Sequence, residues 1–379
     1  MYRAGKPARG WRAAILSLAA GAAFAHTFVY VANYNNSTIG QFREQRNGDL
    51  VARGSVATPT GPESITADTQ GFILTADSLA HAVSAYRIGP RGRLARTAVV
   101  GENAAANPFS VTSSPGGRFV YVANSGDGRV AILHLHPRSG ALTRDGSVSE
   151  GAASRPYAVA ISPNGRLAYV ANFGNDTIGM YARRPGHGGL TRLGMFHEPK
   201  GDGPYGLAIG PDGRFLYVAG FRANVVLVLA IGRHGHLHLR SQTVEPFDHH
   251  PDSLVIDPSG RYLFVANTSA NDVTVFRIDQ RTGRLTRVTH VTAGSYPFSL
   301  TLDVAARFVY AVNFGNSTIS RYRLDHRTGL LKPLGSTAEV SYADPYSITA
   351  VTLPSAAGKP LRTPASVFRR RAKTRGSRP

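Results

Sequence analysis

The alternation of hydrophobic and polar residues predicts short β-strands along most of the chain. Residues 157–162 alternate small apolar and polar side chains, whereas residues 167–171 are apolar nearly throughout. The first pattern predicts a half-buried strand and the second a strand buried on both faces. Two further strands are predicted over residues 177–182 and 190–194, with Pro, Gly and Asn in the turns between them. Four consecutive strands with tight turns predict one four-stranded antiparallel sheet, with strands A, B, C and D.

The same pattern returns at a nearly constant spacing. The apolar strand B, which reads Tyr-Val-Ala-Asn in its commonest form, occurs seven times, and its successive ends are 44, 47, 48, 48, 47 and 46 residues apart. These strands end at Asn33, Asp77, Asn124, Asn172, Gly220, Asn267 and Asn313. A period in this range with several strands per unit is typical of β-propeller blades.

Two other markers share this period. A proline opens each unit, and the seven prolines are Pro62, Pro108, Pro156, Pro204, Pro251, Pro297 and Pro345. A glycine turn followed by leucine closes each unit, with the leucines at Leu50, Leu94, Leu142, Leu190, Leu237, Leu285 and Leu331. The three markers predict an all-β fold, a seven-bladed β-propeller of four-stranded blades. An eight-stranded barrel or a β-sandwich is the alternative, but neither explains the repeat period.

The two ends of the repeat array are incomplete in complementary ways. Residues 27–33 form a strand B without a strand A before it, and residues 345–353 form a strand A with nothing after it. We expect this C-terminal strand A to join the N-terminal strands B, C and D in one blade, because ring closure removes exposed sheet edges. The predicted propeller therefore spans residues 26–353.

Residues 1–25 have the features of a secretory signal peptide. Arg3, Lys6, Arg9 and Arg12 precede the apolar stretch 13–24, and Ala-Phe-Ala at 23–25 fits a cleavage site. The stretch is short for a membrane span. We expect cleavage after Ala25, with a retained N-terminal anchor as the alternative. Cleavage predicts a periplasmic or secreted protein with no transmembrane segment.

The composition narrows the possible chemistry. The chain has no cysteine, which excludes disulfides, thiolate metal sites and a cysteine nucleophile. Of its 43 Lys and Arg residues, four lie in residues 1–25 and eight in residues 355–379, which leaves 31 against 23 acidic residues between them. This mild excess gives no support for a nucleic-acid partner. The basic tail, residues 354–379, is predicted to be disordered, and either contacts an anionic envelope surface or is simply solvated.

The best candidate site is one mouth of the central channel. In an antiparallel pair the start of strand A lies beside the end of strand B, so the residues flanking the prolines should form a ring there. The asparagines at the ends of strand B most simply cap the turn into strand C. More variable residues near this mouth supply the predicted ligand-binding set: Glu63, Asp77, Phe109, Tyr157, Tyr205, Phe298 and Tyr346. Aromatic and charged groups together suit a polar ligand with an apolar face, such as a sugar or a lactone. The alternative is a packed, solvated rim.

The run from Gly203 to Gly220 (GPYGLAIGPDGRFLYVAG) resembles the lactonase-type seven-bladed propellers of the 6-phosphogluconolactonase and carboxymuconate cyclase kind. The Tyr-Val-Ala-Asn and Ser-Thr-Ile segments (37–39 and 317–319) are also similar to YVTN-repeat propellers. The resemblance covers residues 27–353 and implies hydrolysis of a lactone. Hydrolytic members carry Arg-His where this chain has Tyr205 and Gly206, and Asn-Glu where it has Gly220 and Phe221.

Lactone hydrolysis needs a base to activate water and a cation or donor for the developing oxyanion. Other residues predicted near the same mouth can supply these groups. The candidates are His249 or His250 as the base, Asp248 or Asp252 to orient it, and Arg155 or Arg222 for the oxyanion. Two functions stay open: a hydrolase of a sugar lactone such as gluconolactone or its 6-phosphate, or a non-catalytic propeller that binds a ligand, an envelope polymer or a protein.

The sequence predicts neither a metal site nor a cofactor. His234, His236 and His238 have spacing that suits a metal, but they fall in an outer loop without an acidic third ligand, which favours surface histidines. No phosphate-binding glycine loop or EF-hand pattern occurs. We expect a monomer.

Overall fold

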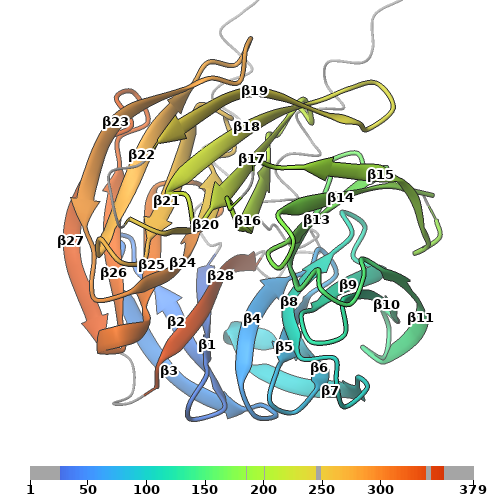
Figure 1. Ribbon diagram of the computed structural model, residues 1–379. Helices are drawn as coiled ribbons and strands as arrows, with labels where there is room; N and C mark the ends of the chain where they lie inside the picture. Colours follow the sequence, from blue (N-terminus) through green and yellow to red (C-terminus); the bar gives the residue numbers. More distant parts are fainter. Residues whose placement is uncertain (1–25, 185, 200, 245–248, 339–342, 354–379) are drawn as a thin grey trace, which may run out of the picture.

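Seven four-stranded antiparallel sheets surround a central axis in the computed structural model (Figure 1). The structure describes residues 26–184, 186–199, 201–244, 249–338 and 343–353. The predicted signal peptide (1–25) and basic tail (354–379) lie outside the described residues, as does Asp248. Among the described residues, no helix has the length and hydrophobicity needed to cross a membrane.

Each blade runs from strand A at the axis to strand D at the outer edge. Blade 1 contains β28 (Pro345–Leu353), β1 (His26–Asn33), β2 (Thr38–Glu44) and β3 (Leu50–Ala57). Blade 2 contains β4 (Pro62–Ala67), β5 (Phe72–Asp77), β6 (Ala82–Ile88) and β7 (Leu94–Gly101). Blade 3 contains β8 (Pro108–Ser113), β9 (Phe119–Asn124), β10 (Arg129–Leu135) and β11 (Leu142–Ser149). Blade 4 contains β12 (Pro156–Ile161), β13 (Leu167–Asn172), β14 (Thr177–Arg183) and β15 (Leu190–His197).

The remaining blades repeat this order. Blade 5 contains β16 (Pro204–Ile209), β17 (Phe215–Gly220), β18 (Val225–Ile231) and β19 (Leu237–Val244). Blade 6 contains β20 (Pro251–Ile256), β21 (Tyr262–Asn267), β22 (Asp272–Ile278) and β23 (Leu285–Thr292). Blade 7 contains β24 (Pro297–Leu302), β25 (Phe308–Asn313), β26 (Thr318–Leu324) and β27 (Leu331–Ala338). Two short 3-10 helices, η1 (Pro90–Gly92) and η2 (Phe314–Asn316), lie in turns. The predicted fold is therefore confirmed, including the closure of the ring by β28 and β1.

Packing between blades explains the strand B motif. Strands β5, β9, β17, β21 and β25 are buried along their whole length, because neighbouring blades cover both faces. Among the described residues, seven hydrophobic clusters form, one between each pair of neighbouring blades. The motif tyrosine also donates a hydrogen bond to the glycine turn between strands C and D of the next blade, as Tyr121 does to Gly188 O (2.8 Å) and Tyr169 to Gly235 O (3.0 Å). Two of the repeated sequence markers thus contact one another.

The asparagine at the end of strand B contributes through its side chain. Asn172 Nδ2 donates to Thr177 Oγ1 (3.1 Å), and Asn313 Nδ2 to Thr318 Oγ1 (2.9 Å), so the amide holds the first residue of strand C. The backbone of Asn313 is extended, with a φ of −111°. The left-handed backbone occurs instead just before strand C, for example at Asp176 and Ser317. The asparagines therefore fix the turn, but not by adopting its left-handed conformation.

An irregularity at the start of strand A directs side chains toward the axis. The residue before each opening proline has a positive φ, and these residues are Gly61, Asn107, Arg155, Gly203, His250, Tyr296 and Asp344. The pairing with strand B then shifts register at the following residue, as between Pro156 and Ala158 in blade 4. A β-bulge of this kind redirects a side chain. The residue after each proline consequently faces the channel.

Candidate functional site in the central channel

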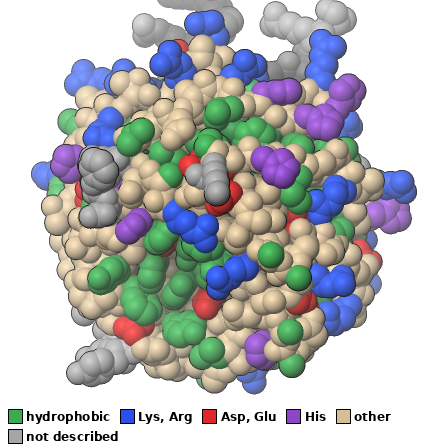
Figure 2. Space-filling view, viewed as in Figure 1, with side chains coloured by type: hydrophobic (Ala, Val, Ile, Leu, Met, Phe, Trp, Pro, Cys, Tyr) green, Lys and Arg blue, Asp and Glu red, His purple; other side chains and the backbone are tan. Residues whose placement is uncertain are grey.

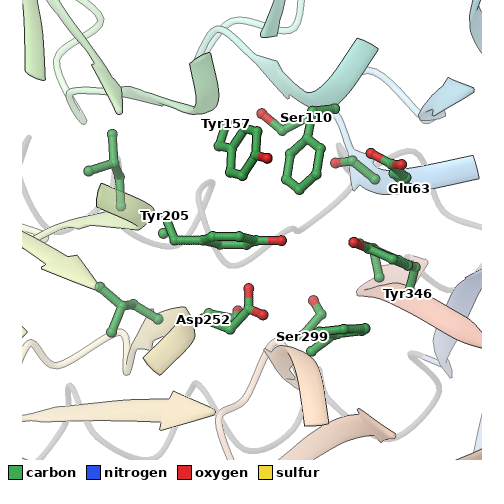
Figure 3. A pocket seen from close by; sticks show the side chains of 15 residues that line it. Glu63, Ser110, Tyr157, Tyr205, Asp252, Ser299 and Tyr346 are labelled. Atoms are coloured by element: carbon green, nitrogen blue, oxygen red, sulfur yellow. The ribbon is translucent and has the colours of Figure 1, made fainter. Parts of the chain in front are cut away.

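The residues that follow the seven prolines meet in one cavity on the axis of the ring. The cavity has a volume of about 190 Å³ (Figure 3). Its lining includes one such residue from every blade: Tyr346, Glu63, Phe109, Tyr157, Tyr205, Asp252 and Phe298. Six of the seven predicted ligand-binding residues therefore lie together, and Asp252 joins them.

Tyr205 lies across the cavity. Its hydroxyl group points toward the Tyr346 hydroxyl group in Figure 3, with Glu63 and Asp252 on opposite sides of the line between the two rings. Burial is the main cause that raises the pKa of both tyrosines above the usual range. Both phenols are consequently neutral hydrogen-bond donors at physiological pH.

Aromatic rings form most of the cavity wall. Phe109 stacks on Tyr157 with ring centroids 4.1 Å apart, and Tyr205 meets Tyr157 edge-on at 5.0 Å. On the other side, Phe298 stacks on Tyr346 at 4.8 Å. Rings in contact support one another and offer flat apolar faces. A sugar ring or a lactone ring can pack against such a surface.

Two carboxyl groups interrupt this wall. Burial raises the pKa of Glu63 to about 7, although a hydrogen bond from Ser78 Oγ to Oε1 (3.0 Å) opposes the shift. The second oxygen, Oε2, is buried and has no hydrogen-bond partner among the described residues. Burial raises the pKa of Asp252 well above its usual range, against the hydrogen bond from Thr268 Oγ1 (3.0 Å). Burial therefore favours the protonated form of both carboxyl groups, and Glu63 is partly ionised near pH 7.

Sequence reasoning missed most of a second ring of residues, each directly after the last residue of strand B. Where strand A supplies an acid, this position holds a hydroxyl group, as in Glu63 with Ser78 and Asp252 with Thr268. Where strand A supplies a tyrosine, it holds an aromatic ring: Tyr157 with Phe173 (4.7 Å), Tyr205 with Phe221 (5.3 Å) and Tyr346 with Tyr34 (5.7 Å). Phe298 pairs with Phe314 in the same way (5.0 Å), and Phe109 is the exception, with Ser125 at this position. This covariation among the repeats was the sequence signal that could have found them.

Three predicted catalytic residues lie at the rim above these rings. The Arg222 guanidinium lies over the Phe173 ring, 4.0 Å from its centroid, and 3.4 Å from Asp176 Oδ1. The charges of Arg155 and Arg222 both act on the Tyr157 phenol. The His250 ring stacks on Phe221 at 4.7 Å, and its Nδ1 contacts Ser269 Oγ at 2.6 Å. On the face in Figure 2, Lys and Arg side chains likewise flank a hollow where hydrophobic side chains gather.

Other predicted residues lie away from the cavity. The His249 ring faces Asp272 at the start of β22, with Nδ1 4.0 Å from Oδ1. Asp77 is fully buried and accepts hydrogen bonds from Thr58 Oγ1 (2.9 Å) and Ser84 Oγ (2.5 Å), so it does not face a ligand. His234, His236 and His238 are exposed around the start of β19. Among the described residues, no group of three or more His, Cys, Asp or Glu side chains has a geometry that could hold a metal ion.

The structure explains why Gly206 cannot carry a larger side chain. A Cβ atom at this position would lie 2.3 Å from the Asp252 carbonyl oxygen of the next blade. Strands β16 and β20 therefore approach too closely for a histidine at 206. Tyr205 and Asp252 occupy the channel instead.

The sequence profile of the family described as "Lactonase, 7-bladed beta-propeller" matches residues 28–345. The chain belongs to this lactonase family. No curated protein sequence is significantly similar to it.

Solved structures agree with this assignment at the level of the fold. A candidate 6-phosphogluconolactonase from Bacteroides fragilis superposes with a TM-score of 0.77 at 20% identity, over 86% of this chain and 98% of that chain. A periplasmic gluconolactonase from Pseudomonas aeruginosa gives 0.75 at 23% identity, over 86% and 99%. A virginiamycin B lyase from Staphylococcus aureus gives 0.58 at 17% identity, over 78% and 92%. Members of this fold with different chemistry are thus similar to this lactonase-family propeller.

Proposed function

We propose that this lactonase-family propeller hydrolyses a sugar lactone in its central cavity, with Glu63 as the general base. The observation that carries the proposal is the Glu63 carboxyl group. It lines the cavity, its pKa is raised to about 7, and its Oε2 has no partner among the described residues. A base with a pKa near the working pH and a free oxygen is suited to take a proton from water.

The cavity dimensions and walls favour a single ring as the substrate. Its volume of about 190 Å³ is below the roughly 300–1,000 Å³ of sites for drug-sized ligands. Aromatic faces can pack on the ring, and the Asp252 carboxyl group can hydrogen-bond to a sugar hydroxyl group. Gluconolactone and 6-phosphogluconolactone are the candidate substrates. Arg155 and Arg222 at the rim could contact the phosphate of the second.

The reaction follows from these roles. The Glu63 carboxylate takes a proton from water while the water oxygen bonds to the lactone carbonyl carbon. The carbonyl oxygen gains the negative charge and accepts a hydrogen bond from the Tyr205 or Tyr346 phenol. The bond from that carbon to the ring oxygen then breaks, and the ring oxygen takes the proton from Glu63. The product is the open hydroxy acid, and Glu63 returns to its starting state.

A non-catalytic binding protein is the second candidate. The motif positions that carry Arg-His and Asn-Glu in hydrolytic members hold Tyr205, Gly206, Gly220 and Phe221 here, and the two aromatic residues build the wall of the cavity. The same cavity could therefore recognise a ring-shaped ligand without reacting with it. In that case the partner would be a small polar ligand or a component of the cell envelope.

An assay of acid release at constant pH separates the two candidates. Purified protein is tested with gluconolactone and with 6-phosphogluconolactone, against the spontaneous rate. We expect turnover in the wild type, a loss of about 100-fold or more in kcat for Glu63→Gln, and a change below about threefold for His250→Ala. Loss of activity only in His250→Ala would move the base to the rim. Ring binding without turnover would support the non-catalytic candidate.

We further propose a periplasmic or secreted location, because residues 1–25 have the features of a signal peptide. Cell fractionation should find the protein outside the cytoplasm, and removal of residues 1–25 should retain it inside. The basic tail could add contact with an anionic surface.

A further inference from the structure

The two faces of the ring carry opposite charge. Strands A and B, and strands C and D, are joined by turns on one face, whereas the remaining connections lie on the face with the channel mouth. Among the described residues, the thirteen A–B and C–D turns contain fourteen arginines and seven acids. The described connections on the mouth side contain two arginines, Arg155 and Arg222, and seven acids. We call the face formed by the A–B and C–D turns the basic face.

The arginines of the basic face are part of the repeat. Each A–B turn from blade 3 to blade 7 ends in an arginine, and each of the seven C–D turns contains at least one. All fourteen are exposed to solvent. Turns of neighbouring blades also contact one another, since the Arg261 guanidinium donates to His326 O of the next blade (2.7 Å). The positive charges are therefore spread around the whole face.

Part of the negative charge on the basic face is turned inward. Asp68, Asp257 and Asp303 are buried in A–B turns. Asp257 Oδ1 accepts hydrogen bonds from the backbone N–H groups of Arg261 and Tyr262, both at 2.8 Å, and so holds the turn that presents an arginine. Fourteen exposed arginines therefore lie beside only four acids that are not buried.

The shape of the basic face suits a flat partner. Its thirteen turns are four to six residues long, so none projects far beyond the others. A planar anionic surface would reach arginines of all seven blades at once, whereas a linear polyanion would cross only part of the ring. A bilayer with anionic headgroups has this geometry, and each arginine near its surface adds to the attraction.

Both ends of the propeller lie on the same face. His26 pairs with Leu353 at the end of blade 1 where the other blades have their A–B turn. Residues 354–379 continue from Leu353 and include eight Lys and Arg residues and no acid. The basic tail therefore starts on the side of the molecule that already carries the positive charge.

We propose that the basic face binds the surface of a bilayer that contains anionic lipids. The guanidinium groups would interact with the lipid phosphate groups, and the tail would add to the same contact. The channel mouth would then face away from the lipid, so that a small ligand enters the central cavity from the aqueous side. The proposal does not depend on the chemistry of that cavity.

Vesicle sedimentation tests the proposal with the mature chain expected after signal cleavage, residues 26–379. The vesicles consist of equal parts of phosphatidylcholine and phosphatidylglycerol, or of phosphatidylcholine alone. We expect binding to the anionic vesicles only, with an affinity that falls steeply as sodium chloride is added. Equal binding to both kinds of vesicle would overturn the proposal, and so would binding to a linear polyanion such as dextran sulfate without binding to the vesicles.

Two matched double variants separate the basic face from the tail and from net charge. Arg138→Glu with Arg166→Glu reverses two exposed charges of the basic face and should weaken binding to the anionic vesicles by about 25-fold or more. Arg129→Glu with Arg155→Glu makes the same change of charge on the mouth side and should weaken binding much less. Wild-type affinity in the first variant would assign the binding to the tail alone. Equal losses in the two variants would assign it to net charge, and either result would contradict the proposal.

A single introduced tryptophan reports which face meets the lipid, because the only native tryptophan, Trp11, precedes the mature chain. Leu330 lies in the C–D turn of blade 7 and Leu79 on the mouth side of blade 2, and both are exposed. Leu330→Trp should transfer excitation energy to dansyl-labelled lipid in the anionic vesicles more efficiently than Leu79→Trp. Equal transfer from the two positions, or the reverse order, would rule out the proposed orientation.

Discussion

At the scale of single residues, the central cavity depends on a few titratable groups in unusual surroundings. Glu63 and Asp252 occupy equivalent positions in blades 2 and 6, and each accepts a hydrogen bond from a hydroxyl group that follows strand B. Asp252 is almost completely buried, which raises its pKa well above the usual range, and burial raises the pKa of Glu63 to about 7. Burial thus shifts both carboxyl groups toward the protonated form within one cavity.

The raised pKa of Glu63 predicts a pH-dependent stability. The carboxyl group has its ordinary pKa, 4.5, in the unfolded chain and about 7 in the folded chain, so the unfolded chain releases its proton first as the pH rises. The free energy of unfolding therefore falls between these two values and changes no further above the upper one. Glu63→Gln should reduce the loss of stability between about pH 5 and pH 8 by up to roughly 3 kcal/mol relative to the wild type. Urea denaturation at both values measures this difference.

A second variant checks the cause of this shift. Ser78→Ala removes the hydrogen bond that opposes the rise of the Glu63 pKa, so it should move the pH-rate profile for lactone hydrolysis to higher pH. The same pH dependence of stability in Glu63→Gln and in the wild type would show that Glu63 does not titrate in this range.

At the scale of the blade, equivalent positions can be compared between repeats. The comparison shows where one blade lacks a residue that the others have and a different residue takes over its contacts. Glu150 directly follows β11 of blade 3 and accepts a hydrogen bond from Asn172 of blade 4. At the contact between blades 1 and 2 the residue equivalent to Glu150 is Thr58, and the acid appears instead at Asp77, where the other blades carry mainly asparagine. Asp77 accepts from Thr58 and Ser84, and the charge of Arg96 acts on it. Asp77 therefore belongs to the contact between blades 1 and 2, which explains why it does not face the channel.

At the contact between blades 4 and 5, a buried glutamate lacks the hydrogen-bonding partners that Glu150 has, and this difference gives a prediction at the scale of the blade. Glu198 corresponds to Glu150, but Gly220, Leu229 and Leu239 replace the asparagine, tyrosine and arginine. Neither carboxylate oxygen has a hydrogen-bond partner among the described residues, and burial together with Asp202 and Asp176 raises the pKa of Glu198 to about 9. Glu198→Met should stabilise the protein at pH 8 by on the order of 1–4 kcal/mol. Chemical denaturation provides the measurement.

The same substitution in blade 4 is the matched control. Glu150→Met removes the acceptor for Tyr181 and Asn172 and leaves Arg192 without its ion pair, so we expect a loss of about 3–5 kcal/mol. Stabilisation by Glu198→Met should also decrease toward low pH, where the wild-type acid is protonated in both states. Equal destabilisation by the two variants would mean that Glu198 has a partner in solution.

The strands could be predicted from the sequence, but several details of the site could not. The predicted strands 167–171 and 177–182 agree with β13 (Leu167–Asn172) and β14 (Thr177–Arg183) to within one residue. This agreement is close because hydrophobic patterning and turn residues define these strands locally. The β-bulge after each proline depends on the pairing of two strands, so no local pattern reveals it. The direction of Tyr205 across the channel and the separation of His249 from His250 follow from this backbone geometry. The sequence therefore predicted which residues lie near the channel better than it predicted the directions of their side chains.

At the scale of the whole molecule, one pair of strands closes the ring. Strand β28 brings residues 345–353 beside residues 26–33, and their separation in sequence makes this the longest-range pairing in the described chain. Every blade depends on its neighbours for burial, since the hydrophobic clusters lie between blades. Opening the ring at blade 1 would expose the edges of β28 and β1 and weaken the clusters that blade 1 shares with blades 2 and 7. We therefore expect this closure to limit the stability of the propeller.

A disulfide across the closure tests this expectation, and the absence of native cysteines keeps the experiment simple. Thr27 and Thr352 lie opposite one another, with their hydroxyl oxygens 2.9 Å apart. The double variant Thr27→Cys and Thr352→Cys should form a disulfide that closes a loop of more than 300 residues, with a stabilisation of up to roughly 5 kcal/mol. The oxidised form should unfold at a higher temperature than the reduced form, and Thr352→Cys alone should not respond to reductant. Equal unfolding midpoints for the oxidised and reduced double variant would show that unfolding begins in another blade while β1 and β28 stay paired.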